Sequence, residues 1–223
     1  MTKNMKNKLV QQTTIIGGED GPVSVFIAGK GDDFKLPLKD RFRNKRYQMR
    51  RKRVEKRIRP EAHTKEETIT YAKEKYGFLP LDETQRKYKS EKRCVREGIV
   101  YKHRPELLGE LLNITIPDVL NEKSLREFYE LLQERERKIE AISDEEVPMD
   151  FKMFELVIGK GHLEMVLDFR WDIFAVSYGG DRKQMRKLRR ITQDLYSYYG
   201  VTEEDITNQT ERYSALVSVL SEF

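Results

Sequence analysis

The chain has 223 residues, of which 38% are hydrophobic, 36% charged and 10% aromatic, and its formal net charge is +5. This length suits one compact domain, the aromatic content argues against wholesale disorder, and the apolar run Val23–Ala28 is far shorter than the roughly 20 residues of a membrane span. The N-terminus lacks the apolar core of a secretory signal and the single Cys94 cannot form an internal disulfide, so we expect a cytoplasmic protein.

Two short β-branched runs flank the turn-forming sequence Gly-Gly-Glu-Asp-Gly-Pro at residues 17–22. Runs of this kind, bounded by glycine and proline, are typical of strands joined by a turn. The sequence therefore predicts a hairpin over residues 13–29, followed by a loop at residues 29–33.

Within this hairpin, the segment Ile15–Phe26 reads IIGGEDGPVSVF. It resembles the Ile-Gly-Gly-Ala-Asp-Gly-Pro-Thr-Ser-Ile-Phe motif of the membrane β subunit of sodium-pumping, biotin-dependent decarboxylases. In that family the motif lies in the ion pathway and its Asp is tied to sodium handling; by position this residue is Asp20, but the resemblance does not imply ion pumping. The present chain has Glu19 and Val23 where the family has Ala and Thr, and it has none of the membrane helices that surround the motif.

The same residues allow three interpretations. Glu-Asp-Gly-Pro is good turn chemistry, in which the Asp side chain caps its own loop. Glycines also permit close backbone approach, so that successive amides and a carboxylate could bind a small ion or ligand. That site would comprise Gly17, Gly18, Asp20 and Gly21. The third interpretation is a docking epitope for a partner.

The positive charge is concentrated between Lys39 and Arg59, a segment that contains twelve Lys or Arg and only two acidic residues, Asp40 and Glu55. This local charge of +10 leaves −5 for the rest of the chain. The segment contains no Gly or Pro before Pro60, so the sequence predicts one helix that ends there. Helical spacing places six cations on one face: Lys39, Arg43, Arg46, Arg50, Arg53 and Arg57. The apolar residues of the segment form no continuous stripe.

A basic helix of this type is compensated by anions or by acidic protein surfaces. The first interpretation is a phosphate-binding helix for RNA or DNA, in which the six cations contact the backbone. The second is a helix that is solvated or docked on an acidic surface, for which the acid-rich residues 127–150 are a candidate. An anionic membrane surface and an acidic protein partner remain as further interpretations.

Four helices are expected next. Thr64 and Glu67 form a capping box that opens a helix ending at Gly77. Asp82–Gln85 repeats the pattern and opens a second helix, to about Arg96 or beyond, and Pro105 starts a short third one. The apolar spacing between residues 121 and 142 predicts a long amphipathic helix.

In the C-terminal third, the spacing of the apolar residues changes from the helical pattern to alternation along the chain. Leu163, Met165 and Leu167 alternate with other residues, which is typical of a strand with one buried face. The sequence predicts a three-stranded antiparallel meander over residues 151–178, with a helix over 151–169 as the alternative. Asp181 then caps a helix that ends at Gly200, and Thr202 opens a final helical segment.

Sequence motifs that carry chemistry are not evident. His63, His103 and His162 lack the paired spacing of metal ligands, and Gly-Lys-Gly at residues 29–31 and 159–161 fits strand turns better than nucleotide loops. The sequence thus indicates no metal, cofactor or catalytic residue and leans towards a protein without enzymatic activity, although catalysis is not excluded.

Together these patterns predict an α+β, mainly helical protein. Its expected regions are a hairpin with the basic helix (1–60), a helical region (61–142) and a small antiparallel sheet packed by C-terminal helices (143–223), which could form one compact domain. The expected function is binding of RNA, DNA or another polyanion through the basic helix. The alternatives are docking of that helix on an acidic protein and binding of an ion or ligand at residues 17–21. The oligomeric state does not follow from the sequence.

Overall fold

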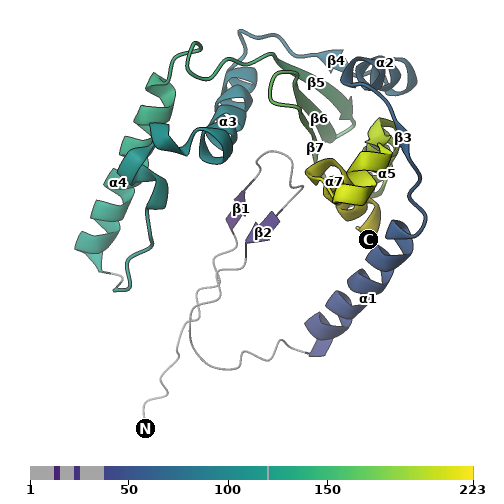
Figure 1. Ribbon diagram of the computed structural model, residues 1–223, viewed down its shortest axis with the longest axis horizontal. Helices are drawn as coiled ribbons and strands as arrows, with labels where there is room; N and C mark the ends of the chain where they lie inside the picture. Colours follow the sequence, from purple (N-terminus) through teal and green to yellow (C-terminus); the bar gives the residue numbers. More distant parts are fainter. Residues whose placement is uncertain (1–12, 16–22, 26–37, 120, 223) are drawn as a thin grey trace.

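The computed structural model describes residues 13–15, 23–25, 38–119 and 121–222. A four-stranded antiparallel sheet in the order β4-β5-β6-β7 lies at its centre (Figure 1). The helices are α1 (Leu38–Glu55), α2 (Lys65–Tyr76), α3 (Arg86–His103), α4 (Glu122–Ala141), α5 (Arg182–Tyr199), α6 (Glu203–Asn208) and α7 (Glu211–Ser221), with two 3₁₀ turns, η1 (Pro105–Leu107) and η2 (Gly109–Asn113). The expected α+β, mainly helical fold class is confirmed.

The predicted meander is present as β5 (Phe151–Ile158), β6 (Gly161–Asp168) and β7 (Ile173–Gly179). Phe151 pairs with Asp168 and Ile158 with Gly161, which places the first turn at Gly159 and Lys160. The helical alternative for residues 151–169 is therefore wrong. A fourth strand, β4 (Leu79–Pro80), pairs with β5 and was not expected.

Helices cover both faces of this sheet. On one face, Leu163, Met165 and Leu167 pack with residues of α2, α5 and α7 in the main core. On the other face, Val166 packs with Tyr88 of α3. The expectation of one buried face on β6 was incomplete, because α3 shields the face that the alternation assigned to solvent.

Local capping signals set several helix ends. The Thr64 hydroxyl accepts a hydrogen bond from Glu67 N, the Glu67 side chain accepts one from Thr64 N, and α2 ends at Gly77 with φ 78°. Asp181 likewise accepts from the backbone amides of Lys183 and Gln184 at the start of α5. These boundaries agree with the predictions.

Two predicted boundaries are wrong. The Asp82 carboxylate accepts from the amide and hydroxyl of Thr84 instead of capping α3; this local turn competes with the helix for the same acceptor. Helix α1 ends at Glu55 rather than continuing to Pro60. Helical geometry is disfavoured at Arg59, the residue before Pro60, and the chain leaves the helix before it to reach β3 (Glu61–Ala62).

The remaining helical predictions are correct in part. The helix expected from Pro105 consists of the two 3₁₀ turns, α4 follows the long amphipathic prediction with Asn121 as its cap, and the final segment is divided into α6 and α7. Near the N-terminus, β1 (Thr13–Ile15) and β2 (Val23–Val25) pair antiparallel as expected for a hairpin. Its turn lies outside the described residues.

The segment that follows α1 is held in place by a second small sheet and by Arg212. Strand β3 pairs with β8 (Gly200–Val201). The guanidinium of Arg212, on α7, donates hydrogen bonds to the carbonyl oxygens of Gly200 (2.8 Å), His63 (3.0 Å) and Tyr199 (2.5 Å) and lies over the Tyr199 ring. Three segments distant in sequence therefore meet at one side chain.

Gly200 is required at this junction. Its φ is 60° and its ψ −161°, and a Cβ atom there would lie 1.7 Å from the carbonyl oxygen of Glu61. We predict that Gly200→Ala lowers the free energy of unfolding by about 3 kcal/mol or more, since backbone strain and a clash with fixed backbone add. Urea denaturation measures the change. Gly77→Ala is the matched control, because its φ is also positive but no atom lies within 4 Å; it should cost about 1–2 kcal/mol. Equal losses would contradict the role of the clash.

We also predict that Arg212→Met lowers the free energy of unfolding by about 2–4 kcal/mol, because several partly buried carbonyls lose a charged donor. Thermal and urea unfolding measure this loss. Arg93→Met serves as control, since Arg93 forms ion pairs with Glu136 and Glu140 at an exposed site and such pairs contribute about 0–1 kcal/mol. A loss at Arg212 no larger than at Arg93 would refute its role as the tie between these segments.

Among the described residues, no helix has both the length and the apolar character needed to cross a membrane.

Candidate nucleic-acid interface

Helix α1 lies along one side of the body, where it packs on α7 (Figure 1). Its partly buried side carries Tyr47, Val54 and, just beyond its end, Ile58, while most of its other described side chains are exposed. The first half of the helix extends past the C-terminal end of α7. The helix is therefore attached along its second half and presents its remaining circumference to solvent.

The structure places the six predicted cations differently along α1. Lys39 lies in the first turn, Arg43 pairs with Asp40 at 3.2 Å, and Arg46 is exposed. Arg50 is partly buried at the α7 side. Arg53 is exposed and Arg57, also exposed, lies two residues beyond the helix end. The predicted row is thus continuous only as far as Arg53.

The second half of this row borders a groove between α1 and the C-terminal helices. Arg50, Arg53 and Arg57 line it together with Leu216 and Leu220 of α7, and its volume is about 680 Å³. The groove brings these cations next to the chain segment around Gly200. The Arg side chains at its edge belong both to the groove and to the exposed surface of α1.

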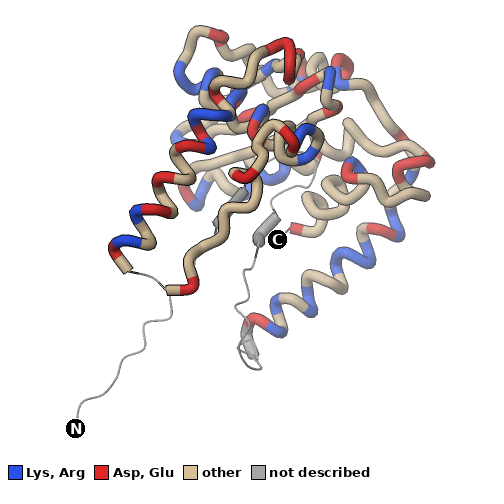
Figure 2. The backbone as a smooth tube through the Cα atoms, turned by 60° about the vertical axis from the view of Figure 1, so that its left-hand side comes forward, with Lys and Arg blue, Asp and Glu red and all other residues tan. Residues whose placement is uncertain are grey.

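Four more cations share the solvent side of α1 and were not assigned by sequence reasoning: Arg41, Lys45, Lys52 and Lys56. The predicted row follows a single line of four- and three-residue spacings along the helix, and these four residues do not lie on that line. Once the side with Tyr47 and Val54 is known to face α7, helical geometry places these four on the opposite side. Figure 2 shows the basic positions repeated along the helix. The basic surface is broader than predicted.

Helix α1 itself contains two acidic residues, Asp40 and Glu55. The ion pairs formed by α1 with described residues include Arg43–Asp40 and Arg51–Glu55, both within the helix. Within the part of the chain that the structure describes, Arg53 and Arg57 form no ion pair. Two apolar side chains, Phe42 (71% exposed) and Met49 (49%), lie among the cations.

The acid-rich residues 127–150 are not where α1 docks. They belong to α4 and the following loop, and α1 and α4 lie at opposite sides of the molecule in both views. α4 packs instead on α3 and η2. The hypothesis of docking on this face is therefore not supported within one chain.

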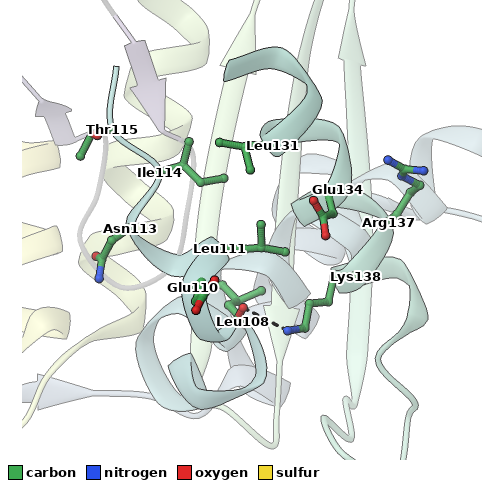
Figure 3. Close-up of a pocket in the computed structure, with 10 residues that line it drawn as sticks. All are labelled: Leu108, Glu110, Leu111, Asn113, Ile114, Thr115, Leu131, Glu134, Arg137 and Lys138. Atoms are coloured by element: carbon green, nitrogen blue, oxygen red, sulfur yellow. Dashed lines mark hydrogen bonds between the residues drawn. The ribbon is translucent and has the colours of Figure 1, made fainter. Parts of the chain in front are cut away.

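A second groove, of about 930 Å³, lies between α4 and the segment around η2. Figure 3 shows Lys138 pointing toward Leu108, whose carbonyl oxygen accepts its hydrogen bond at 3.1 Å. Leu111, Ile114 and Leu131 line the apolar part and Glu110, Glu134 and Arg137 the polar part. The mixed charges and open shape give this groove no clear preference for one class of ligand.

The carboxylate of Asp194 on α5 lies at the centre of a polar cluster. Its Oδ2 atom accepts hydrogen bonds from Tyr71 (2.7 Å), Tyr76 (2.8 Å) and Lys75 (2.9 Å). Burial raises the pKa of Asp194, but these hydrogen bonds outweigh it and hold the pKa below its usual value. Burial and the bond to Asp194 raise the pKa of Tyr76 to about 12. The cluster joins α2 to α5 around a charged carboxylate, so its role in the structure is to hold these two helices together.

The three histidines have separate environments. His63 Nδ1 lies 2.6 Å from the carbonyl oxygen of Tyr198 and its ring stacks on that tyrosine, His103 contacts Trp171, and His162 Nε2 lies 3.6 Å from Glu164. Among the described residues, no three His, Cys, Asp or Glu side chains come close enough to hold a metal ion. The candidate ion or ligand residues Gly17, Gly18, Asp20 and Gly21 lie outside the described residues, so that site and the family resemblance stay predictions.

Comparison with protein-family models, with curated proteins and with solved structures gave no significant match.

The Asp194 cluster generates a pH prediction. Because its folded pKa is lowered, Asp194 stabilises the fold above the usual carboxyl pKa of 3.8, and this contribution is lost as the pH falls through the folded value. We expect Asp194→Asn to lower the free energy of unfolding by about 1–2 kcal/mol at pH 7, allowing for its partial exposure. The difference should shrink below pH 3.8. Urea denaturation at pH 7 and pH 3 measures both, and Asp118→Asn at an exposed loop position is the control. A difference independent of pH would contradict the assignment.

Proposed function

We propose that this chain binds RNA, DNA or another polyanion through the solvent side of α1. The observation that carries the proposal is the orientation of the helix. Its partly apolar side faces α7, most of its other cations are exposed, and Arg53 and Arg57 form no ion pair with described residues. A surface of this kind lowers its electrostatic energy when it binds a polyanion.

The spacing suits a phosphate backbone. Residues 43–53 rise about 15 Å along the helix, over which a duplex carries on the order of nine phosphate charges. Lys and Arg contacts to phosphate position the protein without reading base sequence. We therefore expect binding that depends strongly on salt and weakly on sequence.

An acidic protein partner is the second candidate. Phe42 and Met49 favour it, because exposed aromatic and methionine side chains are enriched at protein interfaces. They are equally suited to contacts with bases, where an aromatic ring stacks. The two candidates differ in salt dependence and in whether pure nucleic acid is sufficient for binding.

The test is fluorescence anisotropy of the purified chain with a generic RNA, a DNA duplex and a single strand, between 50 and 300 mM salt. We expect a log–log slope that corresponds to at least about four phosphates, at roughly 0.9 per phosphate for duplex DNA. The double variant Arg53→Glu/Arg57→Glu should weaken binding and reduce the slope by about 1.8. Both residues are exposed, so the fold should be retained, which circular dichroism checks.

The matched control is Lys89→Glu/Arg170→Glu, which changes the net charge by the same amount at exposed positions on α3 and the β6–β7 turn. Equal effects of the two double variants would show a response to net charge alone and would contradict the assignment to α1. Absence of binding at 50 mM salt would reject nucleic acid as the ligand and favour the protein partner.

A further inference from the structure

A second basic surface lies on the first half of α5. Its buried side carries Leu188, Ile191 and Leu195, which pack in the main core. Helical geometry therefore places the polar residues of this segment on the side facing solvent. The exposed cations are Arg182, Lys183, Arg186, Lys187 and Arg190.

These cations are not compensated within the described part of the chain. None of the five forms an ion pair there, and the nearby Asp181 accepts the backbone amides of the first turn. Arg182, Arg186 and Arg190 follow one another at four-residue spacing, where like charges repel. Arg182 and Lys183 also lie in the first turn, at the positive end of the helix dipole, which adds to the repulsion there. The fold thus maintains an unfavourable concentration of charge at this end of α5.

The turn between β5 and β6 lies beside the first half of α5. A Cβ atom on Gly161 would lie 2.8 Å from Leu188 Cδ1 and 3.0 Å from Gln184 Cβ, and one on Gly159 would lie 3.2 Å from Gln184 Nε2. The turn therefore lies directly against the first two turns of α5. Between these glycines is Lys160, which is exposed. The turn contacts the side of α5 that carries Gln184 and Leu188, so this cation lies beside the helix but on a different side from Arg186.

The end of α7 connects this surface to α1. Leu216 and Leu220 line the groove that contains Arg50 and Arg53, while the carbonyl oxygen of Val219 accepts a hydrogen bond from Gln193 of α5 at 3.0 Å. Both basic helices pack on α7 (Figure 1). Helix α7 therefore connects the two basic helices.

The α5 surface differs from a typical protein interface because it has no large exposed apolar side chains among its described residues. The large hydrophobic residues that are exposed in the described chain lie elsewhere, on α1, on α4 and its preceding loop, and at the β4–β5 edge. A stable protein interface usually contains a buried aromatic or aliphatic centre. Phosphate backbone binding requires only cations at suitable spacing.

We propose that Arg182, Arg186 and Arg190 of α5 form a second contact surface for the nucleic-acid backbone that binds α1. This inference rests on the proposed function. A ligand long enough to cross α7 engages both helices at once, and a short one engages either helix alone. The two contacts on one ligand then act together, as in linked binding sites.

The experiment compares salt slopes for a 24-base-pair and an 8-base-pair DNA duplex by anisotropy. The variants are Arg182→Glu/Arg186→Glu on α5, Arg53→Glu/Arg57→Glu on α1, their combination, and the control Lys89→Glu/Arg170→Glu. On the long duplex, we expect each of the first two to reduce the slope by about 1.8 and the combination by about 3.6. The α5 variant should weaken binding of the long duplex at least tenfold more than the control does.

The outcomes separate the two proposals. If the α1 variant loses binding while the α5 variant matches the control on the long duplex, the second surface is wrong and the proposed function stands. If the wild-type chain binds neither duplex, both fail. Polyglutamate of equal charge provides a further check. If it competes as well as the long duplex, the assignment of the α5 surface to nucleic acid is overturned. The neutral variant Arg182→Gln/Arg186→Gln should show a smaller loss of the same sign, and no loss there would reject direct phosphate contacts.

Discussion

The position of the basic helix depends on the guanidinium of Arg212. A planar group with five donors can satisfy several carbonyl oxygens at once, and here it joins the carbonyls of His63, Tyr199 and Gly200. These belong to the segment after α1 and to the junction between α5 and β8, while Arg212 itself lies on α7. This side chain therefore holds the β3–β8 pairing against α7, the helix on which α1 also packs.

Once α1 is anchored at its C-terminal end, its charge distribution follows from simple geometry. Tyr47 and Val54 face α7, so the cations on the opposite side of the helix, such as Lys45 and Lys52, face solvent. Arg50 is partly buried beside α7. The same reasoning applies to α5, whose buried Leu188 and Ile191 direct Arg186 and Arg190 to solvent. In both helices the hydrophobic contact with the body determines where positive charge is concentrated. The two charged surfaces are thus consequences of core packing.

Local signals predicted much of the fold because they act over a few residues. The capping pair Thr64 and Glu67, the left-handed Gly77 and the strand alternation around Met165 each give a signal contained in one segment. The predictions were wrong where another nearby group occupied the capping side chain, or where a strand depended on a partner far away in the sequence. Asp82 is occupied by Thr84, and two-residue strands such as β3 and β4 have no periodicity and exist only because β8 and β5 lie beside them.

The sequence by itself determined the secondary structure of the long elements and the high charge density of residues 39–59, since both depend on composition and spacing within one segment. It also contained the basic residues of α5, but their significance depends on which side of that helix is buried. Only the tertiary structure decided that α1 packs on α7 and not on the acidic residues 127–150, and that Lys160 lies beside α5. These contacts join residues far apart in the chain, and their energy comes from packing complementarity that no single segment encodes.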